Sequence, residues 1–279
     1  ITADPDASDV SGDLSLVYAI NDDMNVFGRV ARGFRAPSIQ GRILFGDALS
    51  VADSEDVLSV EAGYKADLFD RRARLGLAAF AYRVDDQQLT AVGGTTNFNT
   101  LINAERTNGQ GFELDFDAYL TDNLLVTVGA SYNDTEIDDP NLFVQPCGSG
   151  CTVLDPAGPS AGLVSIDGNS LPQAPEWIAN FTARYSIPVA DGEWYVFTDW
   201  AYRDEVNFFL YESAEYTGKS LTEGGLRIGR NWGAGQYDAS VFARNITNQI
   251  RVVGGIDFNN LTGFINEPRV WGVEFSAKF

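Results

Sequence analysis

Val270-Trp-Gly-Val-Glu-Phe-Ser-Ala-Lys-Phe279 ends the sequence and alternates apolar with polar side chains. Because successive side chains of an extended strand point to opposite faces, this stretch has one apolar face and one polar face. The apolar face consists of Trp271, Val273, Phe275, Ala277 and Phe279. A soluble sheet rarely leaves such a strand at a bare chain end, whereas lipid accepts its apolar face when the strand closes a barrel. The stretch therefore predicts the last strand of a transmembrane antiparallel β-barrel.

The composition agrees with a barrel and argues against membrane-spanning helices. The chain has 279 residues, and 12% of them are aromatic, yet its mean hydropathy is only −0.12. A polar lumen and polar loops dilute the apolar residues of a barrel in this way. A membrane-spanning helix needs about 18 or more apolar residues in a row. The longest apolar run, Leu75 to Tyr82, is far shorter.

Charge and residue usage exclude several classes of function. The formal net charge is −20, which argues against nucleic acid as a partner because phosphate binding needs clustered Lys and Arg. The acidity fits soluble loops better than cation bridging at a surface. The chain has no histidine, so Ser-His-Asp and Cys-His pairs and nearly all zinc sites are excluded. We therefore expect no catalytic residues, no metal site and no cofactor, and predict that the protein is not an enzyme.

The only two cysteines, Cys147 and Cys151, enclose a Gly-Ser-Gly turn. This spacing predicts a small loop disulfide formed in an oxidising compartment, with a metal or redox pair as the alternative. The sequence starts Ile-Thr-Ala-Asp-Pro-Asp, without Met or a signal segment. We therefore expect a mature piece or a fragment of a longer protein.

Alternation along the chain predicts about eleven strands. Short turns join them at one end of the predicted sheet, and long loops join them at the other. The predicted strands are 14–20, 26–35, 58–66, 74–85, 112–120, 124–132, 177–187, 194–203, 221–230, 237–245 and 270–279. The short turns are 21–25, 68–72, 121–123, 189–193 and 231–235, and the long connections are 36–55, 91–103, 133–171, 208–219 and 246–266. Short periplasmic turns and long extracellular loops are typical of transmembrane barrels. Single-chain bacterial barrels have even strand numbers, so eleven strands predict an incomplete one.

Two of these segments need a further remark. Both faces of 74–85 are apolar, so the pattern does not decide which face meets the lipid. The connection 133–171 carries both cysteines and four prolines, and a structureless stretch of this length is expected to be functional or mobile rather than part of a core.

Six short strings, in order along the chain, resemble those of TonB-dependent outer-membrane receptors. They are 25–38, which contains Gly33-Phe-Arg-Ala-Pro-Ser38, 55–70, 103–115, which contains Gly111-Phe-Glu113, Leu171-Pro-Gln-Ala-Pro-Glu-Trp177, Ala243-Arg-Asn-Ile-Thr-Asn248 and Glu267-Pro-Arg-Val-Trp-Gly-Val273. Each string alone is weak evidence. Six in the family's order, over nearly the whole chain, make a specific resemblance.

The resemblance implies a barrel of about 22 strands in the bacterial outer membrane, to which this chain contributes about eleven. It implies active uptake of a scarce ligand, such as a ferric chelate or siderophore, through a receptor plugged by an N-terminal domain and energised by TonB. Residues 1–279 match only the C-terminal half of such a barrel, and the plug domain and the TonB-contacting segment have no counterpart here. A passive porin or an adhesin-type barrel is the alternative, and a soluble β-sandwich adhesin is a more distant one.

The implied partners follow from this architecture. They are outer-membrane lipid and lipopolysaccharide, the plug and first barrel half of the parent protein, TonB through that parent, and the barrel-assembly machinery. The family's C-terminal strand presents an aromatic-ended signal to that machinery. Its counterpart here consists of Trp271, Val273, Phe275 and Phe279.

Alternation also divides the candidate functional residues between the two faces of the barrel. The lumen is expected to receive Glu113, Asp115, Asp117, Arg184, Asp199, Arg203 and Arg227, either as a solvated wall or as contacts to ligand or plug. Interfacial aromatic girdles are expected from Trp177, Tyr185, Trp194, Trp200 and Tyr202. Arg32 falls on the apolar face and is expected to mark a strand end above the lipid.

The ligand is expected to meet the outer loops and the lumen. The candidate ligand-binding residues are Arg35 and Arg203 with the loop aromatics Phe98, Phe208, Phe209, Tyr211 and Phe258. Packing of one loop against another is an equally good explanation for these aromatic residues.

Overall fold

The computed structural model describes residues 3–41, 48–95, 98–148, 150–257 and 260–278, and these contain strands and no helix. Eleven strands form one antiparallel sheet in the order β1-β2-β5-β6-β7-β8-β11-β12-β15-β16-β19, as the sequence predicts. Their bounds are β1 Gly12–Asn21, β2 Met24–Arg35, β5 Glu55–Leu68, β6 Ala73–Gly93, β7 Phe98–Thr121, β8 Leu124–Ile137, β11 Trp177–Val189, β12 Gly192–Arg203, β15 Leu221–Trp232, β16 Tyr237–Arg244 and β19 Val270–Ala277.

Four two-stranded hairpins lie outside this sheet, within the long connections. They are β3 (Ser38–Gln40) with β4 (Ser50–Ala52), β9 (Phe143–Val144) with β10 (Val164–Ser165), β13 (Val206–Asn207) with β14 (Thr217–Gly218), and β17 (Val252–Ile256) with β18 (Thr262–Ile265). None of the described residues forms a helix long and apolar enough to cross a membrane.

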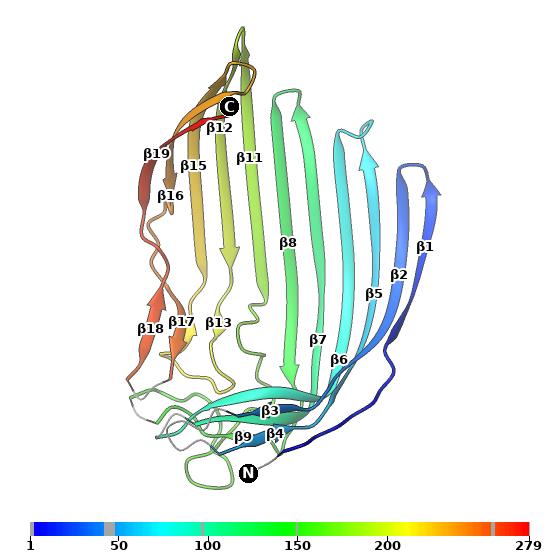
Figure 1. Cartoon of the computed structure of the whole chain (residues 1–279), viewed down its shortest axis with the longest axis vertical. Helices are drawn as coiled ribbons and strands as arrows, with labels where there is room; N and C mark the ends of the chain where they lie inside the picture. The colour runs from blue at the N-terminus through cyan, green and yellow to red at the C-terminus, as the bar shows by residue number, and fades with distance from the viewer. Residues whose placement is uncertain (1–2, 42–47, 96–97, 149, 258–259, 279) are drawn as a thin grey trace.

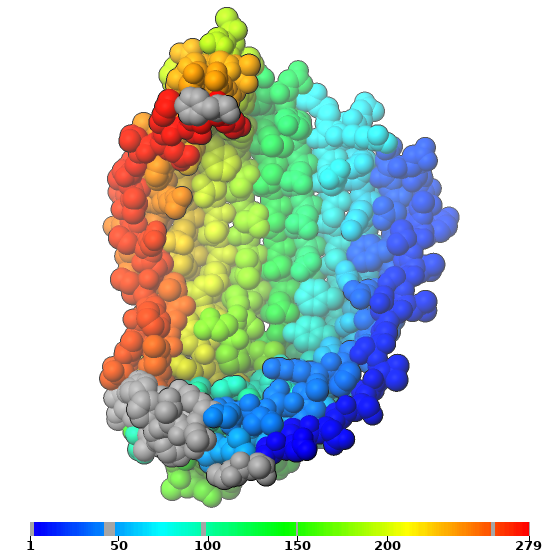
Figure 2. All heavy atoms as spheres, viewed as in Figure 1, coloured from blue at the N-terminus to red at the C-terminus, as the bar shows by residue number. Residues whose placement is uncertain are grey.

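The main sheet curls into a trough that is open along one side (Figure 1). Its two margins are β1 and β19, which do not pair with each other. The long connections gather at one end of the trough, and the short turns and the C-terminus lie at the other (Figure 1). The space-filling view shows the hollow interior between the two margins (Figure 2). The described chain is therefore an open part of a barrel wall.

The register gives the sheet one apolar and one polar face. Directly paired residues share a face, and one such row across seven strands is Leu16, Gly28, Ala62, Ala79, Phe112, Tyr132 and Trp177. A row on the other face is Ala19, Asn25, Lys65, Gly76, Asp115, Gly129, Asn180, Ala201 and Glu223. Large apolar side chains stay uncovered on the first face, for example Leu14 at 78% and Val273 at 81% exposed. The first face therefore meets lipid, and the second lines the lumen.

This register confirms the predicted distribution of charged and aromatic residues between the two faces. The seven predicted lumen residues lie on the polar face and the five predicted girdle aromatics on the apolar face. It also settles β6, where Leu75 and Leu77 lie on the lipid face and Phe80 on the lumen face. Arg32 lies near the loop end of β2 and pairs with Asp9 at 2.7 Å and Asp56 at 2.9 Å. Its charge is thus neutralised at a strand end, as its position predicts.

Five lumen-facing rings lie flat against the wall because each is paired with a glycine of the next strand. The pairs are Phe27 with Gly63, Phe80 with Gly111, Tyr82 with Gly109, Tyr195 with Gly229 and Phe242 with Gly272. A Cβ atom on any of these glycines would lie 2.1–2.8 Å from a ring atom. Only glycine leaves room for the ring there, so the wall stays thin and the ring does not project into the lumen.

Gly109→Ala is therefore expected to lower the free energy of unfolding of the full-length protein by about 1–3 kcal/mol, because the new methyl group overlaps the Tyr82 ring. Urea unfolding in lipid or detergent measures this. Gly33→Ala is the matched control, since nothing lies within 4 Å of its Cβ position. Equal stability of the two variants would contradict this account of the glycine.

The stretch 91–103, predicted to be a loop, is instead mostly strand. The β6–β7 hairpin stays paired out to Gly93 and Phe98, with one interruption at Asp86, whose φ is 56°. Beyond this point the hairpin turns across the end of the trough (Figure 1). The sequence prediction failed because pairing between backbones does not require alternating apolar residues once the strands have left the lipid.

The connection 133–171, predicted not to belong to a core, contributes to one. We call the following buried cluster the loop core: Leu89, Ala104, Ile137, Val144, Val164, Ile166, Val206, Phe208, Leu210, Tyr211 and Tyr216. Its members come from β6, β7, β8 and two long connections, with irregular spacing, so no periodic pattern marks them in the sequence. The loops at this end of the barrel thus form a packed layer with its own apolar centre.

Candidate functional site

The loop containing the two cysteines ties several parts of this layer together. The structure joins Cys147 and Cys151 in a disulfide, with 6.3 Å between their Cα atoms. The amide of Gly94, at the tip of the β6–β7 hairpin, donates to the carbonyl of Pro146 over 2.8 Å. On the other side, the amide and hydroxyl of Thr152 both donate to the Glu215 carboxylate. The disulfide loop therefore bridges the hairpin and the connection that follows β12.

Glu215 and Tyr211 are two of several loop groups whose pKa is shifted. The amide of Thr152, helped by its hydroxyl, stabilises the Glu215 carboxylate and lowers its pKa. Burial raises the pKa of Tyr211, and its hydrogen bond to Asp257 over 2.8 Å raises it further. Both shifts favour the charge state that each group ordinarily has near neutral pH, an ionised carboxylate and a neutral phenol.

The loop aromatics predicted to bind ligand lie mainly inside the loop core. Phe208 is 6% and Tyr211 1% exposed, whereas Phe209 is half-buried and stacks on Tyr211 with 5.5 Å between ring centroids. The side chain of Phe98 and all of Phe258 lie outside the described residues, as does Phe279 of the predicted assembly signal. Loop packing thus accounts for Phe208 and Tyr211, whose rings no ligand reaches in this arrangement.

The two arginine candidates lie at the loop ends of two separate strands. Arg35 ends β2, is 61% exposed and lies 3.9 Å from Glu55. Arg203 ends β12 and donates to the carbonyl of Lys219 over 3.3 Å. Five strands of the sheet separate β2 from β12. The structure therefore does not join these arginines and the loop aromatics into one compact site.

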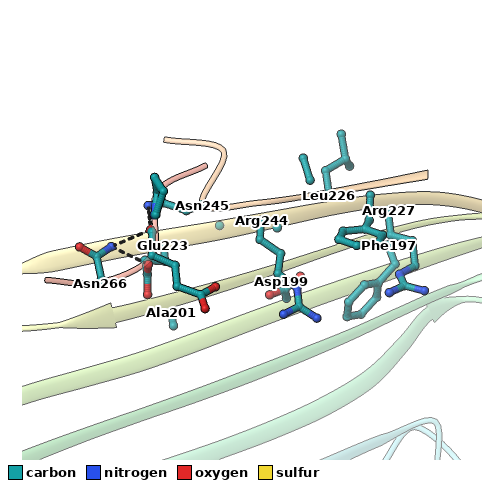
Figure 3. A pocket seen from close by; sticks show the side chains of 15 residues that line it. Phe197, Asp199, Ala201, Glu223, Leu226, Arg227, Arg244, Asn245 and Asn266 are labelled. Atoms are coloured by element: carbon teal, nitrogen blue, oxygen red, sulfur yellow. Dashed lines mark hydrogen bonds between the residues drawn. The ribbon is translucent and has the colours of Figure 1, made fainter. Parts of the chain in front are cut away.

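A hollow of about 730 Å³ lies instead on the lumen face of β12, β15 and β16 (Figure 3). We call it the wall hollow. Its lumen-facing side chains are Phe197, Asp199, Ala201, Glu223, Arg227, Phe242 and Arg244, and Gly224 and Gly225 provide part of its floor. Asn245, Asn266, Glu267 and Pro268 close it at the end nearest the loops. It therefore lies just beneath the loop layer.

Hydrogen bonds hold this closing end rigidly. The buried Asn245, in the left-handed region at φ 45°, donates to the carbonyls of Gln249 and Glu267 and accepts from Thr247 and Gln249. Asn266 donates to the Glu223 carboxylate over 2.8 Å. Asparagine tolerates this backbone conformation and serves both sides of the turn, so the hollow keeps its shape without a ligand.

Two of the charged groups in the wall hollow have protein partners. Arg227 pairs with Glu274 at 2.9 Å and donates to the Ser240 hydroxyl, and Glu223 accepts from Asn266. The guanidinium groups of Arg227 and Arg244 both contact the Phe242 ring, at 5.3 Å and 5.6 Å from its centroid. Sequence reasoning placed Asp199 and Arg227 on the lumen wall but missed Phe242 and Arg244. Their alternation on the polar face of 237–245 was the available signal.

The described residues contain no group of three or more Cys, Asp or Glu placed to hold a metal ion. The wall hollow instead combines rings, guanidinium groups and carboxylates. It can therefore recognise an organic molecule through hydrogen bonds and ring contacts.

Comparison with known proteins places this architecture in a known group. The family profile described as TonB dependent receptor-like, beta-barrel matches residues 2–221. No curated protein sequence matches the chain.

Solved structures with the same arrangement of strands include three metal or siderophore receptors and transporters. The ferric yersiniabactin uptake receptor FyuA from Yersinia pestis has a TM-score of 0.73 at 18% identity, covering 96% of this chain and 37% of that one. The siderophore receptor PiuA from Acinetobacter baumannii has a TM-score of 0.66 at 16% identity, covering 95% of this chain and 35% of that one. The copper transporter OprC has a TM-score of 0.67 at 13% identity, covering 96% of this chain and 39% of that one. The chain thus spans little more than a third of the length of these structures.

Proposed function

Because the chain belongs to the TonB-dependent receptor-like β-barrel family, we propose that it is the C-terminal part of an outer-membrane receptor that actively imports a scarce ligand. The family's members are outer-membrane transport proteins and not enzymes. A ferric chelate or siderophore is the cargo class we propose, since FyuA and PiuA are receptors for such ligands. Uptake by the whole protein would be energised by TonB.

The observation that carries this proposal is the open sheet of eleven strands with one lipid face and one charged face, over most of which the family profile matches. Eleven strands are half of a barrel of about 22, the size reached by plugged outer-membrane transporters. We therefore propose that residues 1–279 form the C-terminal half of the barrel and that the parent contributes the plug and the first half.

The remaining partners follow from this proposal. The apolar face would contact outer-membrane lipid and, at its loop end, lipopolysaccharide. The polar face would contact the plug, and TonB would act through the parent. The barrel-assembly machinery would bind β19 through Trp271, Val273 and Phe275, which are at least 65% exposed.

The loop core argues against the alternative of a passive porin. A passive pore needs an open mouth, whereas here a layer of loops packs around an apolar centre at the mouth end of the wall. A layer of this kind fits a receptor that admits ligand in a controlled step.

Growth of a strain lacking the parent gene, supplied with single iron chelates under iron limitation, tests the proposed function. We expect loss of growth on at least one chelate, restored by the gene only in cells with functional TonB. Restoration that is equal with and without TonB would favour the passive barrel and contradict the receptor.

A further inference from the structure

Arg244 and Asp199 face the wall hollow from its strands without an ion-pair partner. Arg244 makes no hydrogen bond or ion pair within the described part of the chain, and neither does Asp199. In the close-up both side chains extend into the hollow, where they overlap in this view (Figure 3). Of the other charged groups, Arg227 is paired with Glu274, Glu223 accepts from Asn266, and the exposed Glu267 lies at the end of the hollow nearest the loops. On its strand wall, the hollow therefore offers one open guanidinium, that of Arg244, and one open carboxylate, that of Asp199.

The surrounding wall fixes both groups in place. The Arg244 guanidinium stacks on Phe242, and the Phe242 ring rests on Gly272 of β19, where a Cβ would lie 2.4 Å from the ring. The Asp199 carboxylate lies over Gly225 of β15, where a Cβ would lie 2.3 Å from Oδ1. Each charged group is thus supported by a glycine of a neighbouring strand. This arrangement reduces the conformational freedom that a ligand would have to restrict.

The chemistry of these two groups selects a class of ligand. A guanidinium binds a carboxylate through two parallel hydrogen bonds, and an aspartate accepts from a hydroxyl or an ammonium group. Phe197 and Phe242 offer ring contacts for the carbon atoms between such groups. A simple polyanion fits less well, because Asp199 and Glu223 face it from the same hollow.

Resting on the proposed receptor function, we propose that the wall hollow binds an α-hydroxy- or α-amino-carboxylate group of the incoming ligand. Arg244 holds the carboxylate, and Asp199 accepts the hydrogen of the adjacent hydroxyl or ammonium. The hollow lies on the lumen side just beneath the loop layer, so a ligand reaches it after it passes the loops. The full-length receptor thereby reads a carboxylate and its neighbouring donor at one place on the wall.

Calorimetric titration of the full-length receptor in detergent with two probes tests this assignment. Citrate carries a hydroxyl next to one of its carboxylates, whereas tricarballylate has the same three carboxylates without the hydroxyl. We expect a dissociation constant for citrate below about 10 mM, and a higher one for tricarballylate. Arg244→Gln should weaken citrate binding about 10- to 100-fold, because it removes a charge-assisted pair. Asp199→Ala should remove the preference for citrate over tricarballylate.

Arg230→Gln is the matched control, because Arg230 stacks on Trp194 on the lipid face with its guanidinium 5.5 Å from the ring. It should leave citrate binding unchanged, and heat-modifiable migration in gels should show that all three variants are folded. The assignment would be overturned if the folded wild type bound no citrate. This result is expected if a plug segment fills the hollow. Equal binding by wild type and Arg244→Gln would overturn it as well. If TonB-dependent growth on a chelate persists in either case, the proposed receptor function remains supported although the assignment of the hollow is wrong.

Discussion

Residues 1–279 expressed alone behind a signal peptide are expected to be degraded in the periplasm rather than to form a stable barrel. The sheet ends at β1 and β19, and the outer edge of each presents unpaired N–H and C=O groups. In lipid, each such group costs several kcal/mol, because no water is present to bond it. The free-energy cost of two open edges is therefore many times larger than the marginal stability of a folded protein.

The measurement is a gel assay for a heat-modifiable, protease-resistant band in purified outer membranes. Co-expression of the N-terminal half of the parent should restore the band, because that half would supply the missing pairing partners. A resistant monomer formed by residues 1–279 alone would show that the sheet closes on itself and that the half-barrel account is wrong.

The second large effect is expected for Val273→Arg on the closing strand. Val273 is 81% exposed on the lipid face, in a row with Tyr185, Val196, Ile228 and Val241. A charged side chain on this face costs up to about 4 kcal/mol, depending on its depth in the bilayer. We expect the full-length variant to assemble poorly and to unfold at lower urea concentration than the wild type.

Ser276→Arg is the matched control for this substitution. Ser276 lies on the same strand but on the lumen face, directly opposite Asp238. An added guanidinium there meets water and a carboxylate, so assembly and stability should stay close to those of the wild type. If Ser276→Arg lowered the stability more than Val273→Arg, the lipid and lumen faces of β19 would have been assigned the wrong way round.

The strands that sequence reasoning predicts best are those whose two faces differ most. In 112–120 and 124–132, for example, Phe112, Leu114 and Phe116 alternate with acidic residues, and β7 and β8 contain both segments whole. The lipid enforces this alternation, since one face must be apolar and the other must tolerate water. Where the lipid ends the constraint ends too, which is why the outer part of the β6–β7 hairpin has the composition of a loop.

The loop core and the wall hollow could not be found from a single stretch of sequence. Ile137, Val164 and Tyr211 meet through contacts between distant segments, and each lies in a region with no periodic pattern. Asp199 and Arg244 come from different strands, and only the register of β12, β15 and β16 brings them to one hollow. Sequence reasoning could place each residue on the lumen face, but it could not choose which lumen residues lie together.

Disulfide scanning in the full-length parent tests the central claim that this chain is half of a closed barrel. The substitution Ser15→Cys in β1 would be combined with single cysteines along β19 or along the strands that the parent contributes before residue 1. The account predicts that the thiol introduced by Ser15→Cys forms no disulfide with any position of β19 and forms one with the position directly opposite it on a parent strand. A disulfide between the thiol introduced by Ser15→Cys and a position of β19 would contradict it, because the eleven strands would then close on themselves.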